Sequence, residues 1–326
     1  MSNALKALVI LALIGIFAIG GSFFYVKDKA ERPGPHDVAT RVVVEPGSSI
    51  KTISASLETL GIITNSLQFR LWARLTEQHT KLRAGEFDIP AQASIADVLN
   101  VLERGETVVR KLTLAEGLTV TEMLIIIQDA EGLIGEVTNI PDDGMMLPET
   151  YFYSWGDHRE DLVTRMVRGM EDLVRMQWLA RADDFILETP EQMLTLASIV
   201  EKETGLANER PKVAAVFLNR LKKGMRLQSD PTVVFALTNG SGALGRALSR
   251  ADLKTDSPYN TYQVKGLPPG PIANPGRDSV LAVMNPADTD AVYFVADGSG
   301  GHVFAKTLKQ HNRNVAKWRK FKRGQK

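Results

Sequence analysis

The chain opens with an apolar segment, residues 7–25, that contains no charged side chain. Because a helix rises about 1.5 Å per residue, roughly 20 such residues cross the hydrocarbon core of a bilayer. A cleaved signal peptide is the alternative, but its apolar region is usually shorter, and bulky Phe23, Phe24 and Tyr25 end the segment here. We therefore expect residues 1–25 to form a short cytoplasmic stub and an uncleaved transmembrane anchor.

Residues 26–40 carry charges, Pro and Gly without an apolar period, and they predict a short linker. Positive charges flank the anchor on both sides, Lys6 before it and Lys27 and Lys29 after it. The positive-inside rule therefore does not decide the orientation of the anchor.

Three later segments share one pattern, in which a hydroxyl residue precedes an apolar residue and further apolar residues follow three and seven positions later. A hydroxyl N-cap that opens a helix with one buried stripe explains this pattern. Each segment also follows a short strand-like run, at residues 42–44, 86–89 and 108–114. We therefore predict small α+β units in series, with helices that begin after Ser49, Ser94 and Thr119.

The first of these units, residues 44–54, resembles the start of a LysM module, a βααβ fold associated with glycans that contain N-acetylglucosamine. Ser48 stands where that module has a hallmark Asp. A strand followed by a turn and a capped helix is also common in other folds. Glycan contact and a purely structural role therefore both remain open for this unit.

The clearest helix start lies further along, where Thr189 offers an N-cap and Pro190 occupies the first helical position. We expect this helix to run to about Glu203, with Gly205 as the C′ residue just beyond its cap. Its apolar residues form one broad face, with Glu201 and Glu203 at the two opposite margins of that face. Glutamates at a helix end are usually a solvated surface, so the pattern alone does not indicate catalysis.

A second helix follows, with Asn208 as its expected cap and Gly224 just after its end, so the two helices form a hairpin. The chain beyond it is rich in turn residues and hydrogen-bonding side chains, mainly in residues 224–233, 249–276 and 292–307. Loops of this composition border clefts more often than cores. They predict a binding cleft in this part of the chain.

The same segments resemble the successive motifs of one family. The motifs are ASIVEKET (residues 197–204), VFLNRL (216–221), GMRLQSDPT (224–232), SPYNTY (257–262), GLPPGPI (266–272) and YFVADG (293–298). In this order they are similar to the MltG, or YceG-like, family of endolytic murein transglycosylases. The resemblance extends from the anchor to about residue 309, and so many ordered motifs are highly specific.

The resemblance implies that the first glutamate of the VEKET stretch, Glu201, is the catalytic residue, with Glu203 as the reserve candidate. It also implies a glycan cleft lined by further motif residues, although turn formation is an equally good explanation for each of them. These residues are Gln228, Asp230, Thr232, Tyr259, Asn260 and Tyr262.

Glycosidases usually pair two carboxyl groups, and the sequence offers one convincing candidate. A lytic transglycosylase explains this, because the 6-hydroxyl of the substrate's own N-acetylmuramic acid attacks its anomeric carbon. A raised pKa would keep the catalytic acid protonated near neutral pH, and burial beside an apolar helix face raises it. Asp230 or Asp256 acting as a second carboxylate would instead indicate a muramidase that uses water.

Composition removes several other classes of protein. The net charge of +1 gives no global attraction to nucleic acid. With no Cys there is no disulfide, thiolate metal site or lipoprotein anchor, and five His without helical ligand spacing do not support a zinc hydrolase. No glycine-rich phosphate cup between a strand and a helix supports a pyridoxal enzyme. We expect neither a metal nor another cofactor.

We therefore predict an α+β protein of the following parts: an anchor (1–25), a linker (26–40), a LysM-like domain (41–112), a connecting α+β segment (113–188) and a catalytic domain with a helical hairpin (189–326). The expected function is endolytic cleavage of peptidoglycan outside the cytoplasmic membrane. Implied partners are glycan strands and peptidoglycan synthases of the elongation or division machinery. The alternative is a catalytically silent glycan-binding or division scaffold.

Overall fold

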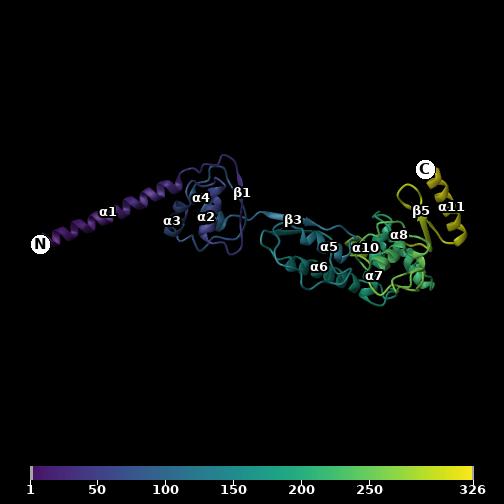
Figure 1. Cartoon of the computed structure of the whole chain (residues 1–326). Coiled ribbons are helices and arrows are strands. Elements are labelled where there is room, and N and C mark those ends of the chain that lie inside the picture. Colours follow the sequence, from purple (N-terminus) through teal and green to yellow (C-terminus); the bar gives the residue numbers. More distant parts are fainter. Residues whose placement is uncertain (1–2, 325–326) are drawn as a thin grey trace. The chain divides into compact units, whose positions relative to one another are not determined.

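The computed structural model describes residues 3–324 (Figure 1). The chain divides into two compact units. The first unit comprises residues 1–110 with 131–134 and 152–157, and the second comprises residues 111–130, 135–151 and 158–326. The predicted mixed α+β class is confirmed. The segment 113–188, predicted to connect two domains, lies mostly in the same unit as residues 189–326.

The apolar N-terminal segment forms one helix, α1 (Asn3–Glu31), of which Ile10–Glu31 is long and apolar enough to cross a membrane. The helix continues through residues 26–31, where the sequence predicted a linker. Ala30 is only 2% exposed and belongs to the core of the first unit. His36 is also buried, and its Nε2 lies 2.7 Å from the carbonyl oxygen of Pro90. This segment is thus a packed part of the first unit.

The first unit is built on an antiparallel strand pair, β1 (Thr40–Val44) and β2 (Gly85–Ile89), in which Val42 lies opposite Phe87. The helices α2 (Ile50–Thr59), α3 (Ser66–Leu75) and α4 (Ile95–Arg104) share one apolar core with these strands. Leu57, Phe69, Phe87 and Leu99 are fully buried there. The unit therefore has a core of its own.

The predicted helix starts in this region are confirmed. Ser49 accepts a hydrogen bond from the backbone N–H of Thr52, and Ser94 forms a capping box with Asp97. Thr119 and Glu122 form the second capping box, at the start of α5 (Val120–Gln128). Around α5, β3 (Val109–Thr113) and β4 (Thr150–Ser154) form a two-stranded sheet, and the long helix α6 (Arg159–Leu179) follows.

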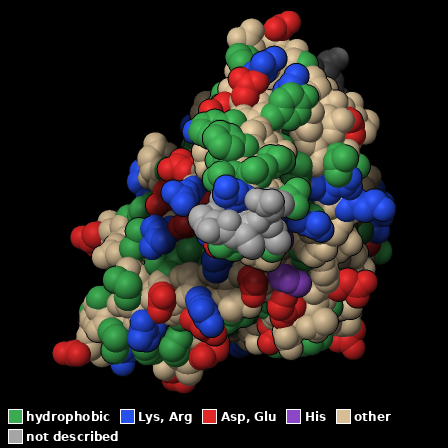
Figure 2. All heavy atoms as spheres, turned by 90° about the vertical axis from the view of Figure 1, so that its left-hand side faces the viewer, with side chains coloured by type: hydrophobic (Ala, Val, Ile, Leu, Met, Phe, Trp, Pro, Cys, Tyr) green, Lys and Arg blue, Asp and Glu red, His purple; other side chains and the backbone are tan. Residues whose placement is uncertain are grey.

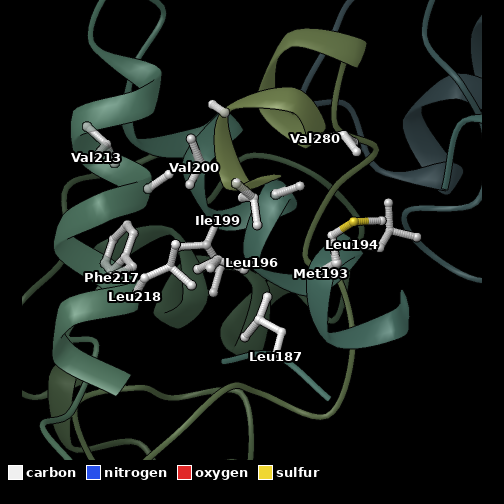
Figure 3. Close-up of a cluster of buried hydrophobic side chains, with 14 of the residues drawn as sticks. Leu187, Met193, Leu194, Leu196, Ile199, Val200, Val213, Phe217, Leu218 and Val280 are labelled. Atoms are coloured by element: carbon white, nitrogen blue, oxygen red, sulfur yellow. The ribbon is translucent and has the colours of Figure 1, made fainter. Parts of the chain in front are cut away.

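The second unit is organised around α7 (Pro190–Glu203), which is buried on every side from Met193 to Val200. It packs against α8 (Arg210–Lys222) in the predicted hairpin and against α10 (Arg277–Met284). Figure 3 shows Ile199 and Val200 of α7 next to Val213 and Phe217 of α8, and Val280 of α10 belongs to the same buried cluster. Because α7 is fixed by packing along most of its length, the residues of its last turn are held in place.

The loops beyond the hairpin carry short elements. They are α9 (Asp230–Thr238), the 3-10 helix η1 (Asp252–Lys254), the antiparallel hairpin β5 (Tyr293–Ala296) and β6 (His302–Ala305), and the helix α11 (Leu308–Gly324).

The helix α7 ends at Glu203, as predicted, but two capping residues in the hairpin differ from the sequence prediction. Thr204 caps α7 with an extended backbone, and Gly205 does not adopt the left-handed conformation of a C-terminal cap. The N-cap of α8 is Glu209 rather than Asn208. Gly224, however, follows α8 with a φ of 62°, which a residue without Cβ adopts at little cost.

Candidate active site

The last turn of α7 carries two carboxyl groups on different sides of the helix. With about 3.6 residues per turn, Glu201 and Glu203 are turned away from each other by roughly 200°. The partners of Glu201 come from α8 and the start of α10, whereas the partner of Glu203 precedes α9. The predicted separation of the two residues is confirmed, and each has its own environment.

The carboxyl group of Glu201 is buried and fully engaged. Its side chain is 5% exposed. One oxygen, Oε2, accepts hydrogen bonds from Ser279 Oγ at 2.7 Å and from the backbone N–H of Gly276 at 3.0 Å. The other, Oε1, accepts from Nη2 of Arg210 at 3.0 Å. Both oxygens are therefore bound by the protein itself.

Arg210 is the cation at the centre of this cluster, and its side chain is 9% exposed. Besides Glu201, it donates to Glu116 Oε2 at 2.8 Å and lies 3.5 Å from a carboxylate oxygen of Asp278. Burial raises the pKa of Glu116, and the negative charge of Glu201 adds to that effect. Buried charges are tolerated when they are paired in this way, so the cluster ties the ends of α7, α8 and α10 together.

Glu203 lies in a different setting. The hydroxyl of Ser229 donates to its Oε1 at 2.5 Å. Burial raises the pKa of Glu203 to about 7, and the negative charge of Asp230 acts in the same direction. The C-terminal end of α7 also disfavours a negative charge there. Such a group is partly protonated at neutral pH, as a general acid and base requires.

Hydrogen bonds join two loops beside Glu203, one that contains Ser229 and one that contains Thr261. The backbone N–H of Ser229 donates to Thr261 Oγ1 at 3.0 Å, and that oxygen is 2.9 Å from the hydroxyl of Thr232. Asn260 Nδ2 donates to the carbonyl oxygen of Thr255 at 2.7 Å. The sequence placed Thr232 and Asn260 among the glycan contacts, but both side chains are completely buried. They instead hold the loops that present Ser229 and its neighbours.

Gln228, Asp230 and Tyr262 remain on the accessible side of these loops. Gln228 and Asp230 are exposed, and Tyr262 is partly exposed. The hydroxyl of Tyr262 donates to Asp230 Oδ1 at 2.6 Å. Gln228 has a φ of 52°, which is uncommon for a residue other than Gly, and its N–H donates to the carbonyl oxygen of Thr261. The three residues flank Ser229, the hydrogen-bond donor to Glu203.

Asp230 also lines a pocket of about 430 Å³, a volume within the range of ligand sites. Phe235 and Ile272 contribute apolar surface, and Lys202, Glu122 and Arg246 contribute charge. Within residues 3–324, no cluster of His, Asp and Glu has the arrangement of a metal site.

Tyr259, the remaining predicted cleft residue, lies elsewhere. It lines a second pocket, of about 400 Å³, together with Asp142, Asp143 and Glu191. Its ring centroid is 4.8 Å from that of Phe235. The structure therefore brings Gln228, Asp230 and Tyr262 together near Glu203 and does not place Tyr259 in that group.

The comparison with known proteins agrees with the motifs. The sequence model of the YceG-like family matches residues 42–317, which is most of the chain. The chain therefore belongs to the YceG-like family.

Relatives of this YceG-like chain include an endolytic murein transglycosylase of Bacillus subtilis (strain 168), which is 32% identical over 92% of the chain and 91% of the relative. Another endolytic murein transglycosylase, from Streptococcus pneumoniae (strain ATCC BAA-255 / R6), is 29% identical over 95% of the chain and 65% of the relative. A crystal structure of a YceG-like protein from Listeria monocytogenes has a TM-score of 0.52 and 30% identity, and it aligns with 84% of this chain.

Sequence reasoning missed several residues of the YceG-like site. Ser229 lies inside the quoted motif GMRLQSDPT, but nothing in its neighbourhood indicates that its hydroxyl meets α7. In the sequence, Arg210 looks like an ordinary basic residue at the start of a helix. Its burial among carboxylates depends on Glu116, which is 94 residues away in the sequence. The only local signal for either residue is a polar side chain at a helix start.

Proposed function

We propose that this protein is a lytic transglycosylase that cuts peptidoglycan strands internally, at the β-1,4 bond between N-acetylmuramic acid and N-acetylglucosamine. Membership of the YceG-like family supports this activity, as do relatives that are named endolytic murein transglycosylases. The product on one side of the cut is a 1,6-anhydro-muramic acid end. The proposed substrate is the nascent glycan strand made during cell-wall synthesis.

We assign the acid/base role to Glu203, the reserve candidate of the sequence analysis, in place of Glu201. The deciding observation is that Ser229 and Asp230, from a motif that resembles the family's cleft, adjoin Glu203. Glu201 is instead occupied by Arg210 and by donors at the start of α10. A carboxyl group that transfers protons to a ligand needs a free oxygen facing that ligand. Only one oxygen of Glu203 has a hydrogen-bond partner among the described residues.

In the proposed reaction, the protonated carboxyl group of Glu203 first gives its proton to O4 of the departing N-acetylglucosamine as the bond from O4 to the anomeric carbon breaks. The 6-hydroxyl oxygen of the muramic acid then attacks that carbon, and the Glu203 carboxylate takes the hydroxyl proton. The substrate supplies the nucleophile, so one carboxyl group serves as acid and base in turn. Ser229 keeps the group oriented through both steps.

Glu201 is a positioning residue in this proposal. Its ion pair with Arg210 and its bond to Ser279 connect the last turn of α7 to α8 and α10. Glu203 lies two residues further along the same turn, so its carboxyl group depends on this attachment. Small displacements of a reacting group reduce rates strongly, and we expect Glu201 to affect activity through position.

The test compares Glu203→Gln with Glu201→Gln, a matched pair in the same helix turn. Loss of a general acid lowers rates by roughly 100-fold to 10,000-fold. We expect that loss of 1,6-anhydro product for Glu203→Gln, with no loss of thermal stability. Glu201→Gln should keep measurable activity and unfold at a lower temperature. Mass spectrometry of digested sacculi and thermal unfolding provide the two measurements.

The opposite ranking, with Glu203→Gln active and Glu201→Gln stable but inactive, would return the catalytic role to Glu201. Asp230 is an exposed carboxylate near Glu203, so the product also needs to be identified. If Asp230 activated water, the new reducing ends would be heavier than the anhydro ends by one water molecule. The same mass spectra distinguish a muramidase from a transglycosylase.

We further propose that α1 anchors the protein in the cytoplasmic membrane with both compact units on the outer side. The apolar helix is compatible with a single-pass anchor, and the substrate of the proposed reaction lies outside that membrane. Peptidoglycan synthases that move in the same membrane plane are the expected partners. The LysM-like unit would add affinity for glycan, and binding of the Glu203→Gln protein to intact sacculi would measure that affinity without cleavage.

A further inference from the structure

The helix α3 has an exposed apolar stripe that no described part of the chain covers. Its leucines at positions 67, 71 and 75 follow one another at four-residue spacing, and they are 64%, 42% and 47% exposed. Residues at this spacing lie one above another on a helix. The opposite side of α3, with Phe69, Trp72 and Ala73, is buried in the core of the first unit. The leucine stripe, Leu67, Leu71 and Leu75, is thus a second apolar face on a short helix.

The leucine stripe is flanked by positive charge. Arg70 and Arg74 lie beside it on the helix surface, and α3 contains no acidic residue. Figure 2 shows a face of the chain on which exposed hydrophobic side chains lie among Lys and Arg side chains. A leucine face bordered by arginines is typical of helices that lie in the headgroup region of a bilayer. Arginine side chains there bury their methylenes and reach phosphate groups with the guanidinium.

Within the first unit, α3 packs against the C-terminal part of α1. Trp72 of α3 lies against Phe23 of α1, with ring centroids 6.1 Å apart. Phe23 belongs to the uncharged apolar segment of the chain. At about 1.5 Å per residue, it lies roughly 12 Å closer to the N-terminal end of α1 than Glu31 does. Thus α3 lies beside the last apolar turns of α1 (Figure 1).

The C-terminal end of α1 is packed against the first unit. Val26 and Ala30 pack against the same core as α2, α3 and α4. No free linker separates the anchor from the unit, so the angle at which α1 enters the membrane also sets the orientation of α3.

We propose that α3 docks on the phospholipid bilayer, with the leucine stripe inserted among the lipids and Arg70 and Arg74 at the phosphate level. The inference rests on the proposed membrane anchorage of α1 and goes beyond the proposed reaction. An exposed apolar stripe on a helix that contacts the anchor, together with adjacent positive charge, selects the bilayer over a protein as the occupant. Docking would hold the first unit close to the membrane surface.

The absence of Cys makes a direct test possible in the full-length chain. The variants Leu71→Cys and Leu75→Cys would carry an environment-sensitive fluorophore. Lys51→Cys, at an exposed position in the first turn of α2, provides the matched control. Each protein is placed in nanodiscs of phosphatidylcholine and phosphatidylglycerol, with spin labels on the acyl chains as the lipid-phase quencher and iodide as the aqueous quencher.

We expect the labels at 71 and 75 to emit at shorter wavelength than the label at 51 and to be quenched from the lipid phase. The label at 51 should respond only to iodide. Iodide quenching alone at 71 and 75 would overturn the proposal. Short-wavelength emission without lipid quenching would also overturn it, since a protein or a second copy would then cover α3. Recovery of the chain with the discs reports anchorage by α1 separately, and neither result depends on glycan cleavage.

Discussion

At the residue scale, Glu201 and Glu203 lie in the same helix turn but have different interaction partners. Glu201 is paired with a buried arginine, whereas Glu203 is partly buried and has a single hydroxyl donor. These partners lie far away in the sequence: Ser229 is 26 residues from Glu203, and Ser279 is 78 residues from Glu201. The motif VEKET contains both glutamates and does not indicate which of them reacts. The chemical difference between them therefore exists only in the folded chain.

The raised pKa of Glu203 predicts how activity depends on pH. With a pKa of about 7, the protonated form needed for the first step is lost as the pH rises through neutrality. We therefore expect kcat/KM to fall on the alkaline side of pH 7. The Ser229 hydrogen bond lowers this pKa, so Ser229→Ala should move the alkaline limb to higher pH. If the alkaline limb of kcat/KM stayed at the same pH in Ser229→Ala, the pH dependence would not arise from the ionisation of Glu203.

The same pKa predicts a dependence of stability on pH. The pKa of Glu203 is raised in the folded protein relative to the ordinary value of 4.5, so the folded state binds more protons between those two values. Its contribution to stability is therefore lost as the pH rises from about 4.5 to about 7. Glu203→Gln cannot ionise, and we expect it to be more stable than the wild type by about 3 kcal/mol at pH 8. At pH 4 the difference should vanish, and equal stabilities at pH 8 would contradict a buried, ionising Glu203.

At the scale of elements, the Arg210 cluster joins α7, α8 and α10. Arg210→Met would leave the carboxylates of Glu201 and Glu116 without their cation, and breaking a buried pair in this way costs about 3–5 kcal/mol. The exposed pair of Arg277 and Glu149 is a matched control. Because exposed pairs contribute less than about 1 kcal/mol, Arg277→Met should have little effect. Denaturant unfolding measures the free energy of unfolding of both variants. Equal decreases in the two variants would mean that Arg210 does not hold these helices together.

Helix starts with a hydroxyl cap were predictable because such caps and apolar stripes are local signals. Ser49, Ser94, Thr119 and Thr189 each accept the backbone hydrogen bond that their sequence pattern predicts. The end of α7 at Glu203 was predicted correctly, but the conformation of the residues after it was not, because Thr204 is extended and Gly205 is not left-handed. The distant partners of Glu201 and Glu203 were not predictable, since no residue near Gly205 indicates those contacts.

The cleft was predictable as a region and not as a set of contacts. The motifs around residues 224–232 and 257–262 do meet, through Ser229, Thr232 and Thr261. Polar residues in such loops either face a ligand or hold the loop, and composition does not distinguish these roles. Asn260 and Tyr262 show the difference, since one is completely buried and the other is partly exposed.

At the scale of the whole molecule, the chain has two separate apolar cores. One contains Phe69 and Phe87 of the first unit, and the other contains Phe217 and the buried face of α7 in the second unit. The chain passes between the units more than once, because residues 131–134 and 152–157 belong to the first. The candidate acid and its partners all belong to the second unit.

Separate cores predict separate responses to core mutations. Phe69 is fully buried, and removing a buried Phe costs about 3–5 kcal/mol, so Phe69→Ala should strongly destabilise the first unit. Hydrogen exchange should then rise in α2, α3 and α4 while α7 and α8 keep their protection. Phe217→Ala, in the second core, is the matched variant and should reverse this pattern.

Because Glu203 is fixed by the second core, cleavage of soluble glycan fragments should persist in Phe69→Ala and fail in Phe217→Ala. Increased exchange in both units from either substitution would instead mean that the two units unfold as one cooperative structure.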